Sequence, residues 1–218
     1  MQPDVRLIAI LDPAAVGATA LEAALAAEAG GATILQVRMK NSGGAEVLAW
    51  TERLVQAVRI PVWVNDRADV AWLAGAAGVH LGADDLPADR VRARSGRPLH
   101  VGVSVGTSRE AHHARAMGAD YWSLGSVYAT GSKPDAGAAL GVGGFARLAA
   151  LAPAGVPCIA IGGVTVERIA ELCAAGARGV AAIGAVFGER DIERAARRLR
   201  DALDAALGSR KTDGRRTR

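Results

Sequence analysis

The stretch Ala29-Gly30-Gly31-Ala32-Thr33-Ile34 joins the end of an alanine-rich segment to the start of an apolar, β-branched run. The same order of features returns at 74–79, 117–121 and 175–180. Glycine is typical of the position where a helix ends, so each copy predicts a helix that leads directly into a strand. Neighbouring copies lie roughly 40 to 60 residues apart, which leaves room for one more strand and helix between them.

Further apolar runs fill these intervals and precede the first copy, at 7–11, 61–65, 100–104 and 157–161. Segments with helical periodicity, such as 14–29, 45–58 and 166–175, separate the strands. Regular alternation of strand and helix predicts a parallel sheet. Eight such units within residues 1–207 predict an α/β protein with a single domain, a compact (β/α)8 TIM barrel.

An open, doubly wound sheet is the competing architecture. Its usual phosphate loop is a G-x-G-x-x-G motif after the first strand, whereas this chain has Asp12-Pro13-Ala14 at that place. The sequence therefore favours the barrel.

The positive charge of the chain lies at its C-terminal end. The formal net charge is +4, and the five Lys or Arg and one Asp of residues 208–218 account for all of it. Because the rest of the chain is neutral, we expect no nucleic-acid partner. Residues 208–218 have no apolar side chain to pack and are predicted to form a basic, disordered tail, with a weak polyanion contact as the alternative.

No segment has the pattern of a signal peptide or a membrane span. The apolar run 7–11 stops at Asp12-Pro13, and Pro and Gly interrupt the uncharged stretch 148–166. Cys158 and Cys173 fall in a predicted strand and a predicted helix, where they are expected as small apolar fillers. We therefore expect a cytoplasmic protein without a membrane partner.

The end of the second predicted strand carries Gln36, Arg38 and Lys40 at alternate positions. Alternation in a strand places these three side chains on one side, at the barrel mouth where such barrels carry their chemistry. Two cations and an amide predict an anion site, since Arg and Lys both suit phosphate oxygens. A solvated strand edge with salt bridges is the alternative.

Carboxylates follow the next two strands, in Asn65-Asp66-Arg67 and in Asp84-Asp85. Asp66 and Asp85 at neighbouring strand ends are able to bind Mg²⁺ beside a phosphate, because this ion takes one or two carboxylates together with water and phosphate oxygens. The alternatives are that Asp66 pairs with Arg67 or Arg38, and that Asp85 caps the helix beginning near Pro87.

The remaining strand ends supply hydroxyls and glycines. Ser104 ends the fifth strand, and the connection 125–141 is long enough to be functional and contains Thr130-Gly131-Ser132-Lys133. Gly162 and Gly163 follow the seventh strand, and Ile183-Gly184 the eighth, where barrels of this type commonly bind phosphate through backbone N–H groups.

Other reactive or bulky residue types are expected to be structural. His80 is interpreted as a packed or hydrogen-bonded strand residue, and His112 and His113 as solvated. The four tryptophans are expected to pack in the core or between helices and barrel, at positions 50, 63, 72 and 122.

Six motifs in chain order resemble those of the thiamine-phosphate synthase family: 36–40, 65–67, 78–87, 102–104, 130–135 and 161–163. The resemblance implies a compact (β/α)8 barrel and a Mg²⁺-dependent transferase. It implies that 4-amino-5-hydroxymethyl-2-methylpyrimidine diphosphate is coupled with 4-methyl-5-(2-phosphoethyl)thiazole, or its carboxylated form, to give thiamine phosphate and pyrophosphate. The implied partners are these small molecules, with a homo-oligomer possible.

The same resemblance implies roles for individual residues. The pyrimidine diphosphate would be held by Gln36, Arg38, Lys40, Asn65, Ser104 and Lys133, of which Arg38, Lys40, Lys133 and Ser104 would be catalytic. Asp66 and Asp85 would bind Mg²⁺. The thiazole phosphate would lie among Thr130, Gly131, Ser132, Gly162, Gly163, Ile183 and Gly184.

The chain departs from the family pattern at Met39, Ala83 and Ser126, where an acidic residue, Gln and Pro are usual. A sister family tautomerises the thiazole carboxylate phosphate with a His at the position of Ser126, and the lack of that His favours the synthase. A non-catalytic phosphate-binding barrel is the alternative of another class.

Overall fold

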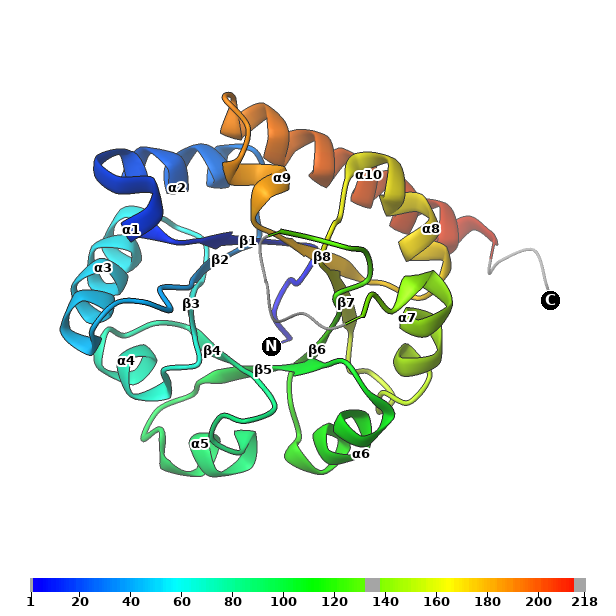
Figure 1. Ribbon diagram of the computed structural model, residues 1–218, viewed down its shortest axis with the longest axis horizontal. Helices are drawn as coiled ribbons and strands as arrows, with labels where there is room; N and C mark the ends of the chain where they lie inside the picture. The colour runs from blue at the N-terminus through cyan, green and yellow to red at the C-terminus, as the bar shows by residue number, and fades with distance from the viewer. Residues whose placement is uncertain (1, 132–137, 214–218) are drawn as a thin grey trace.

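The computed structural model describes residues 2–131 and 138–213. Eight parallel strands close into one barrel in sequence order, with β1 paired to both β2 and β8. Helices form a ring around it (Figure 1). The predicted (β/α)8 barrel is therefore confirmed. The strands are β1 (Leu7–Leu11), β2 (Ile34–Val37), β3 (Val62–Asn65), β4 (Gly78–Leu81), β5 (His100–Val105), β6 (Tyr121–Leu124), β7 (Cys158–Ile161) and β8 (Gly179–Ala182).

The helices lie between the strands as the alternation predicted. They are α1 (Pro13–Val16), α2 (Ala20–Ala29), α3 (Gly44–Ala57), α4 (Ala68–Leu73), α5 (Ala88–Arg94), α6 (Ser108–Met117), α7 (Gly141–Ala149), α8 (Ile169–Ala174), α9 (Gly184–Phe187) and α10 (Ile192–Asp213), with 3-10 turns at Gly17–Thr19 and Val166–Arg168. Within residues 2–131 and 138–213, no helix is both long and apolar enough to span a membrane.

The four glycine motifs end helices as expected. Each contains a glycine in the left-handed region, with φ of 96° at Gly31, 69° at Gly75, 64° at Gly118 and 114° at Gly176. A side chain is strained in this conformation, so glycine lets the chain leave the helix and enter the next strand within a few residues.

The barrel interior is filled by a separate apolar cluster: Val5, Ile8, Ile10, Ile34, Trp63, Tyr121, Ile159 and Ala181. Its two large rings lie beside glycines of neighbouring strands, since Trp63 pairs in register with Gly78, and Tyr121 with Gly102. The larger core cluster lies between the strands and the helix ring. Alternation along each strand thus separates an inner from an outer core.

Two expectations about helices were wrong. The segment 14–29 is not one helix, because Gly17, at φ 78° and ψ −141°, ends α1 and the chain restarts after a 3-10 turn. Helix α10 continues to Asp213, past Leu207, where the tail was predicted to begin. Helical hydrogen bonds need no apolar side chains, and Arg and Lys favour helix, so the basic segment extends it. Residues 214–218 of the predicted tail lie outside the described residues.

The tryptophans fall into two groups. Trp63 and Trp122 are fully buried and Trp50 packs against the outer core, as expected. Trp72 is 51% exposed, so its expected core position was wrong. Helix α4 buries Val70 and Ala71, which leaves the adjacent Trp72 and Leu73 on its exposed side.

Helix α10 lies across the junction between the first and last parts of the chain. Gly30 contacts it so closely that a Cβ there would lie 2.6 Å from the Cβ of Ala196. Arg200 donates to the carbonyl of Gly31 (2.9 Å), and Arg6 pairs with Asp204 (2.8 Å). These contacts hold the C-terminal helix against the segments that flank β1.

Gly78→Ala is expected to lower the free energy of unfolding by about 1–3 kcal/mol, because the added methyl overpacks a filled interior. Its Cβ would lie 2.5 Å from the Trp63 ring and 2.9 Å from the carbonyl oxygen of His100. Urea unfolding measures the change. The control is Gly208→Ala, which meets nothing within 4 Å in α10 and should be equally or slightly more stable than the parent. Equal stability of the two variants would contradict this packing argument.

Candidate active site

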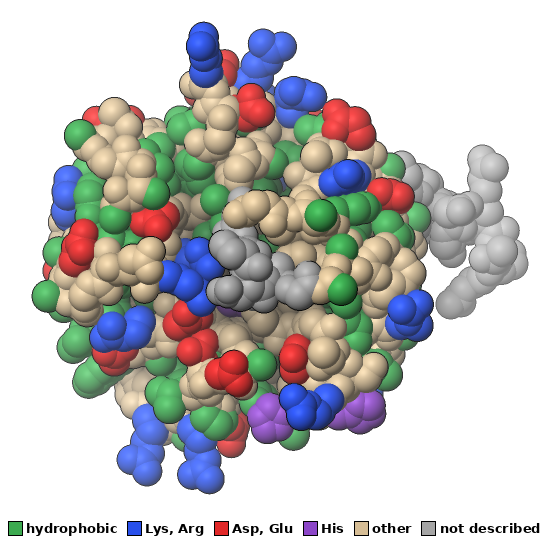
Figure 2. Space-filling view, in the orientation of Figure 1, with side chains coloured by type: hydrophobic (Ala, Val, Ile, Leu, Met, Phe, Trp, Pro, Cys, Tyr) green, Lys and Arg blue, Asp and Glu red, His purple; other side chains and the backbone are tan. Residues whose placement is uncertain are grey.

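A cavity of about 710 Å³ opens at the C-terminal ends of the strands. The sequence-predicted residues that line it are Gln36, Arg38, Lys40, Asn65, Asp66, Asp85, Ser104, Thr130, Gly162, Gly163, Ile183 and Gly184. Gly131 is exposed and is not among its lining residues. Ser132 and Lys133 lie outside the described residues. In the view down the barrel, basic and acidic side chains lie side by side near the centre (Figure 2).

The end of β2 supplies the cationic side of this cavity. The backbone N–H of Arg38 donates to the carbonyl of Leu11 (2.8 Å), which continues the strand pairing past Val37. Gln36 is only 3% exposed and donates from Nε2 to Oδ1 of Asn65 (3.0 Å). Met39, between the two cations, is instead buried in the outer core. Alternation therefore brings Arg38 and Lys40 to one side of the chain.

The ends of β3 and β4 supply two carboxylates. Asp66 has a left-handed backbone, with φ of 64°, and its N–H donates to the carbonyl of His80 (2.8 Å). Its carboxylate lies 3.6 Å from Nζ of Lys40. Asp85 accepts a hydrogen bond from the N–H of Gly82 (2.6 Å). The left-handed region is uncommon for residues other than glycine, although Asp tolerates it better than most.

The alternative partners considered for these carboxylates are wrong. Arg67 pairs with Asp69 (2.6 Å) rather than with Asp66. The residue that precedes α5 is Pro87, and no side chain caps that helix. Both carboxylates therefore remain directed at the cavity, one beside Lys40 and one on the Gly82 turn.

Burial raises the pKa of Asp66, and a hydrogen bond and like charge from Asp85 raise it further, while Lys40 acts in the opposite direction. Two carboxylates in contact disfavour double ionisation unless a cation lies beside them. The described residues contain no group of three or more His, Cys, Asp or Glu side chains that could bind a metal ion. A metal at Asp66 and Asp85 would thus take its other ligands from water and substrate.

The opposite side of the cavity is built from backbone. Gly162 and Gly163 have φ of 93° and 62°, and a Cβ on either would lie within 3 Å of the chain at Ser126–Ala129. Two hydrogen bonds fasten that chain to the loop, from Val127 N–H to Ile161 (2.8 Å) and from Tyr128 N–H to Gly162 (3.1 Å). The seventh strand end and the start of the long connection therefore form one unit.

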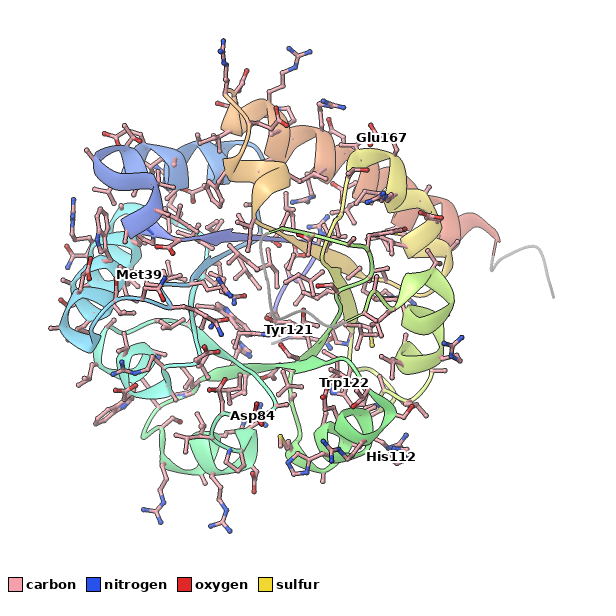
Figure 3. The ribbon with its side chains drawn as sticks, viewed as in Figure 1. Met39, Asp84, His112, Tyr121, Trp122 and Glu167 are labelled. Carbon is pink, nitrogen blue, oxygen red and sulfur yellow. The ribbon has the colours of Figure 1, made fainter. Side chains whose placement is uncertain are left out.

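A row of polar side chains lies at the floor of the cavity, inside the ring of strands. His80 contacts the hydroxyl of Tyr121 through Nδ1 (2.7 Å) and that of Ser104 through Nε2 (2.9 Å). The interpretation of His80 as a buried, hydrogen-bonded residue is confirmed, and His112 and His113 are exposed on α6 as expected. Figure 3 shows Tyr121 within the barrel and His112 on its outer side.

The sequence interpretation missed two polar groups of the cavity wall. Glu110 accepts from the N–H of Gly106 (2.6 Å), and its own N–H donates to Oγ1 of Thr107 (3.2 Å). Thr-x-x-Glu before a helix is a capping pattern that was readable in the sequence. Ser123 faces the cavity from β6 and was hidden in an otherwise apolar run.

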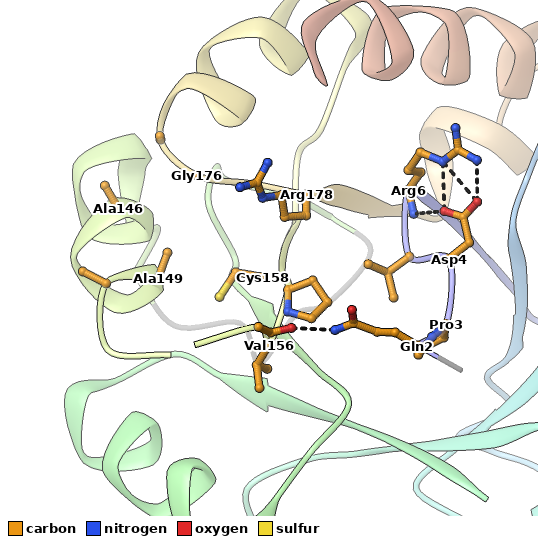
Figure 4. Close-up of a pocket in the computed structure, with 15 residues that line it drawn as sticks. Gln2, Pro3, Asp4, Arg6, Ala146, Ala149, Val156, Cys158, Gly176 and Arg178 are labelled. Carbon is orange, nitrogen blue, oxygen red and sulfur yellow. Dashed lines mark hydrogen bonds and ion pairs between the residues drawn. The ribbon is translucent and has the colours of Figure 1, made fainter. Parts of the chain in front are cut away.

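A second depression, of about 680 Å³, lies at the opposite end of the barrel, where strands β7 and β8 begin (Figure 4). Gln2 donates to the carbonyl of Gly155 there (2.6 Å), and Asp4 pairs with Arg6 (2.5 Å). Barrel enzymes carry their chemistry at the other face, so this depression is not the candidate site.

The position of the first cavity, over the C-terminal strand ends of a closed barrel, places the chain in the class of (β/α)8-barrel enzymes. Comparison with known proteins narrows the class. The family model for thiamine monophosphate synthase matches residues 7–186. The chain belongs to that family.

Individual relatives agree with the family. Thiamine-phosphate synthase of Methanoculleus marisnigri is 44% identical over 203 residues, which cover 91% of this chain and 93% of that protein. The enzyme of the same name from Moorella thermoacetica is 40% identical over 195 residues, or 88% and 92% of the two chains. The solved thiamine phosphate pyrophosphorylase of Pyrococcus furiosus superposes with a TM-score of 0.83 at 31% identity, covering 95% of this chain and 99% of that one.

Asp66→Asn is expected to raise the stability of the metal-free protein near pH 7. Because the pKa of Asp66 is raised in the folded protein, ionisation of this carboxyl lowers the free energy of unfolding at pH values above that pKa. This loss of stability disappears as the pH falls through the raised pKa. Urea unfolding should show the variant more stable than the parent near pH 7, with a smaller difference at about pH 4. The control is Asp84→Asn, at an exposed carboxylate, which should show no such trend. A destabilised Asp66→Asn protein near pH 7 would contradict the like-charge explanation.

Proposed function

We propose that this chain is a Mg²⁺-dependent thiamine-phosphate synthase that joins 4-amino-5-hydroxymethyl-2-methylpyrimidine diphosphate to 4-methyl-5-(2-phosphoethyl)thiazole or its carboxylated form. The products are thiamine phosphate and pyrophosphate. One observation carries the proposal: Arg38 and Lys40 line one cavity together with the carboxylates Asp66 and Asp85, and the far side of this cavity is built from glycine loops. Membership of the family supplies the reaction type.

The diphosphate is assigned to the cationic side. Arg38 offers a planar fork for its oxygens and Lys40 a compact charge, while Gln36 and Asn65, already joined by a hydrogen bond, orient the ring end of the substrate. Ser104 provides a hydroxyl at the cavity floor. Lys133, from the long connection, is assigned to the same diphosphate on sequence grounds.

Asp66 and Asp85 are the proposed Mg²⁺ ligands. The donor set fits this ion, since two carboxylates in contact, one with a raised pKa, favour a divalent cation between them. Bound there, Mg²⁺ would neutralise charge that develops on the leaving diphosphate. Lys40, 3.6 Å from Asp66, would then be released toward the phosphate oxygens.

The thiazole phosphate is assigned to the glycine side, among Thr130, Gly131, Ser132, Gly162, Gly163, Ile183 and Gly184. Glycines at this place expose backbone N–H groups to an anion, and loops after the seventh and eighth strands commonly bind phosphate in barrels. The two substrates would approach each other from opposite walls of the cavity.

The reaction needs no protein nucleophile. The C–O bond to the diphosphate breaks with its electron pair, leaving a cation stabilised by the aminopyrimidine ring, and the thiazole nitrogen then donates its lone pair to form the C–N bond. Arg38, Lys40 and Lys133 stabilise the departing charge, and the walls of the cavity hold the two partners in line.

Ser126 bears on the tautomerase alternative. It is buried at the cavity wall, where the tautomerase of the sister family has an imidazole, and a hydroxyl does not replace that base. A non-catalytic barrel would bind the phosphates without releasing pyrophosphate. We further propose a reducing, cytoplasmic setting, supported by the burial of both cysteines, Cys158 and Cys173, and a homo-oligomer remains a prediction.

Purified protein given both substrates and Mg²⁺ is expected to release pyrophosphate and form thiamine phosphate, and EDTA should stop both. Asp66→Ala and Lys133→Ala should nearly abolish turnover with an unchanged circular dichroism spectrum. Isomerisation of the carboxylated thiazole without pyrophosphate would instead support the tautomerase.

Arg38→Ala is expected to lower kcat on the order of 10²–10³-fold, because it removes one preorganised charge from the departing diphosphate. Steady-state pyrophosphate release measures the loss. Arg90→Ala is the matched control, since its highly exposed guanidinium lies on α5 outside the cavity, and it should retain the parent rate. Equal rates for the two variants would exclude the role given to Arg38.

A further inference from the structure

The side chains of Ser104, His80 and Tyr121 form a continuous hydrogen-bonded chain that begins at the cavity floor and crosses three strands. His80 on β4, Gly102 on β5 and Tyr121 on β6 share one level of the barrel, since His80 pairs in register with Gly102 and Gly102 with Tyr121. Ser104 lies two residues beyond Gly102, on the same side of β5. A Cβ at Gly102 would collide with the Tyr121 ring, so the glycine lets this ring cross β5 and reach His80.

The Tyr121 hydroxyl decides the direction of the first hydrogen bond. The residue is 0% exposed, and within the described part of the chain its only hydrogen-bond partner is Nδ1 of His80, at 2.7 Å. Burial raises the pKa of Tyr121, so the hydroxyl keeps its proton. A buried hydroxyl without an acceptor for its hydrogen is costly, and Nδ1 is the acceptor at hand.

The direction of the second bond follows from the first. Because Nδ1 accepts, the ring proton of the neutral imidazole resides on Nε2. Nε2–H then donates to Oγ of Ser104 at 2.9 Å. With its oxygen accepting from His80, the Ser104 hydroxyl has its own hydrogen left to donate, and this residue lines the cavity. A protonated imidazolium would carry hydrogen on Nδ1 and leave the Tyr121 hydrogen without an acceptor.

We propose that His80 and Tyr121 are positioning residues that orient the Ser104 hydroxyl as a hydrogen-bond donor toward the bound pyrimidine diphosphate. The direction of donation runs from Tyr121 to His80 to Ser104 and from there into the cavity. His80 thus acts as a fixed neutral donor and transfers no proton itself. This role rests on the proposed synthase function, whereas the tautomer of His80 is a property of the free protein.

The tautomer is tested without substrates. Two-bond ¹H–¹⁵N correlation spectra of histidine-labelled protein distinguish a protonated from an unprotonated ring nitrogen, and His80→Gln identifies the His80 signals by their loss. We expect a protonated Nε2 and an unprotonated Nδ1. A protonated Nδ1, in either a neutral or a charged ring, would overturn the proposal whatever the enzyme turns over. The expected tautomer in a protein that never releases pyrophosphate would instead overturn the synthase function.

A pair of substitutions tests how His80 acts. The amide nitrogen of Gln is able to reach the place of Nε2 and keep a donor for Ser104, whereas the shorter Asn reaches only the place of Nδ1. His80→Asn is expected to lower kcat roughly tenfold or more, the equivalent of one lost hydrogen bond, and His80→Gln to recover part of the rate. His112→Asn, on the outer side of α6, should leave the rate unchanged.

A double-mutant cycle separates positioning from packing. If His80 acts through Ser104, His80→Asn should have little further effect on kcat in a Ser104→Ala background. Multiplicative losses would show that His80 acts independently of Ser104 and would overturn the proposal. Should His80→Asn fail to fold, Tyr121→Phe with and without Ser104→Ala provides the same cycle, with the same two outcomes.

Discussion

The interior of a closed eight-stranded barrel must be filled without voids, and here two rings fill it by crossing glycines on neighbouring strands. Trp63 lies beside Gly78, and Tyr121 beside Gly102. Packing each ring against a glycine of the adjacent strand fixes the register, because a slip of one residue would move the ring away from its glycine. The same register determines which side chains lie at the mouth of the barrel. There Gln36 donates a hydrogen bond to Asn65, and Asp66 interacts with Asp85. Interior packing and site geometry therefore have a common origin.

The mouth concentrates charges that the fold alone does not need. Asp66 is held in an uncommon backbone conformation beside a second carboxylate, with Lys40 as partial compensation. Such an arrangement opposes folding, and a ligand-binding site is where proteins commonly retain it. Hydrogen bonds hold two carboxylates of this region in place. Asp85 accepts from the N–H of Gly82, and Glu110 accepts from the N–H of Gly106. Part of the site is thus held in place before a ligand binds.

The architecture was largely predictable, because each glycine motif combines a helix end and a strand start within six residues, and that information is local. Most predicted site residues meet in one cavity for a similar reason, since parallel strands all end at the same face. What could not be predicted depends on contacts between distant segments. The approach of Asp66 to Asp85 depends on how two loops fold. The exposure of Trp72 likewise reflects which neighbours a helix has, a property that periodicity does not contain. The continuation of α10 has a local cause instead, the helix propensity of Arg and Lys, which the absence of apolar side chains conceals.

The C-terminal helix joins the two ends of the chain, and this has a consequence for biosynthesis. Strand β1 needs β8 to complete its pairing, and the segments flanking β1 need α10 to cover them. A nascent chain that has left the ribosome only as far as β7 therefore presents an unpaired strand edge together with uncovered apolar surface. Closure becomes possible only after β8 and α10 have emerged, and until then the exposed edge and apolar surface favour aggregation.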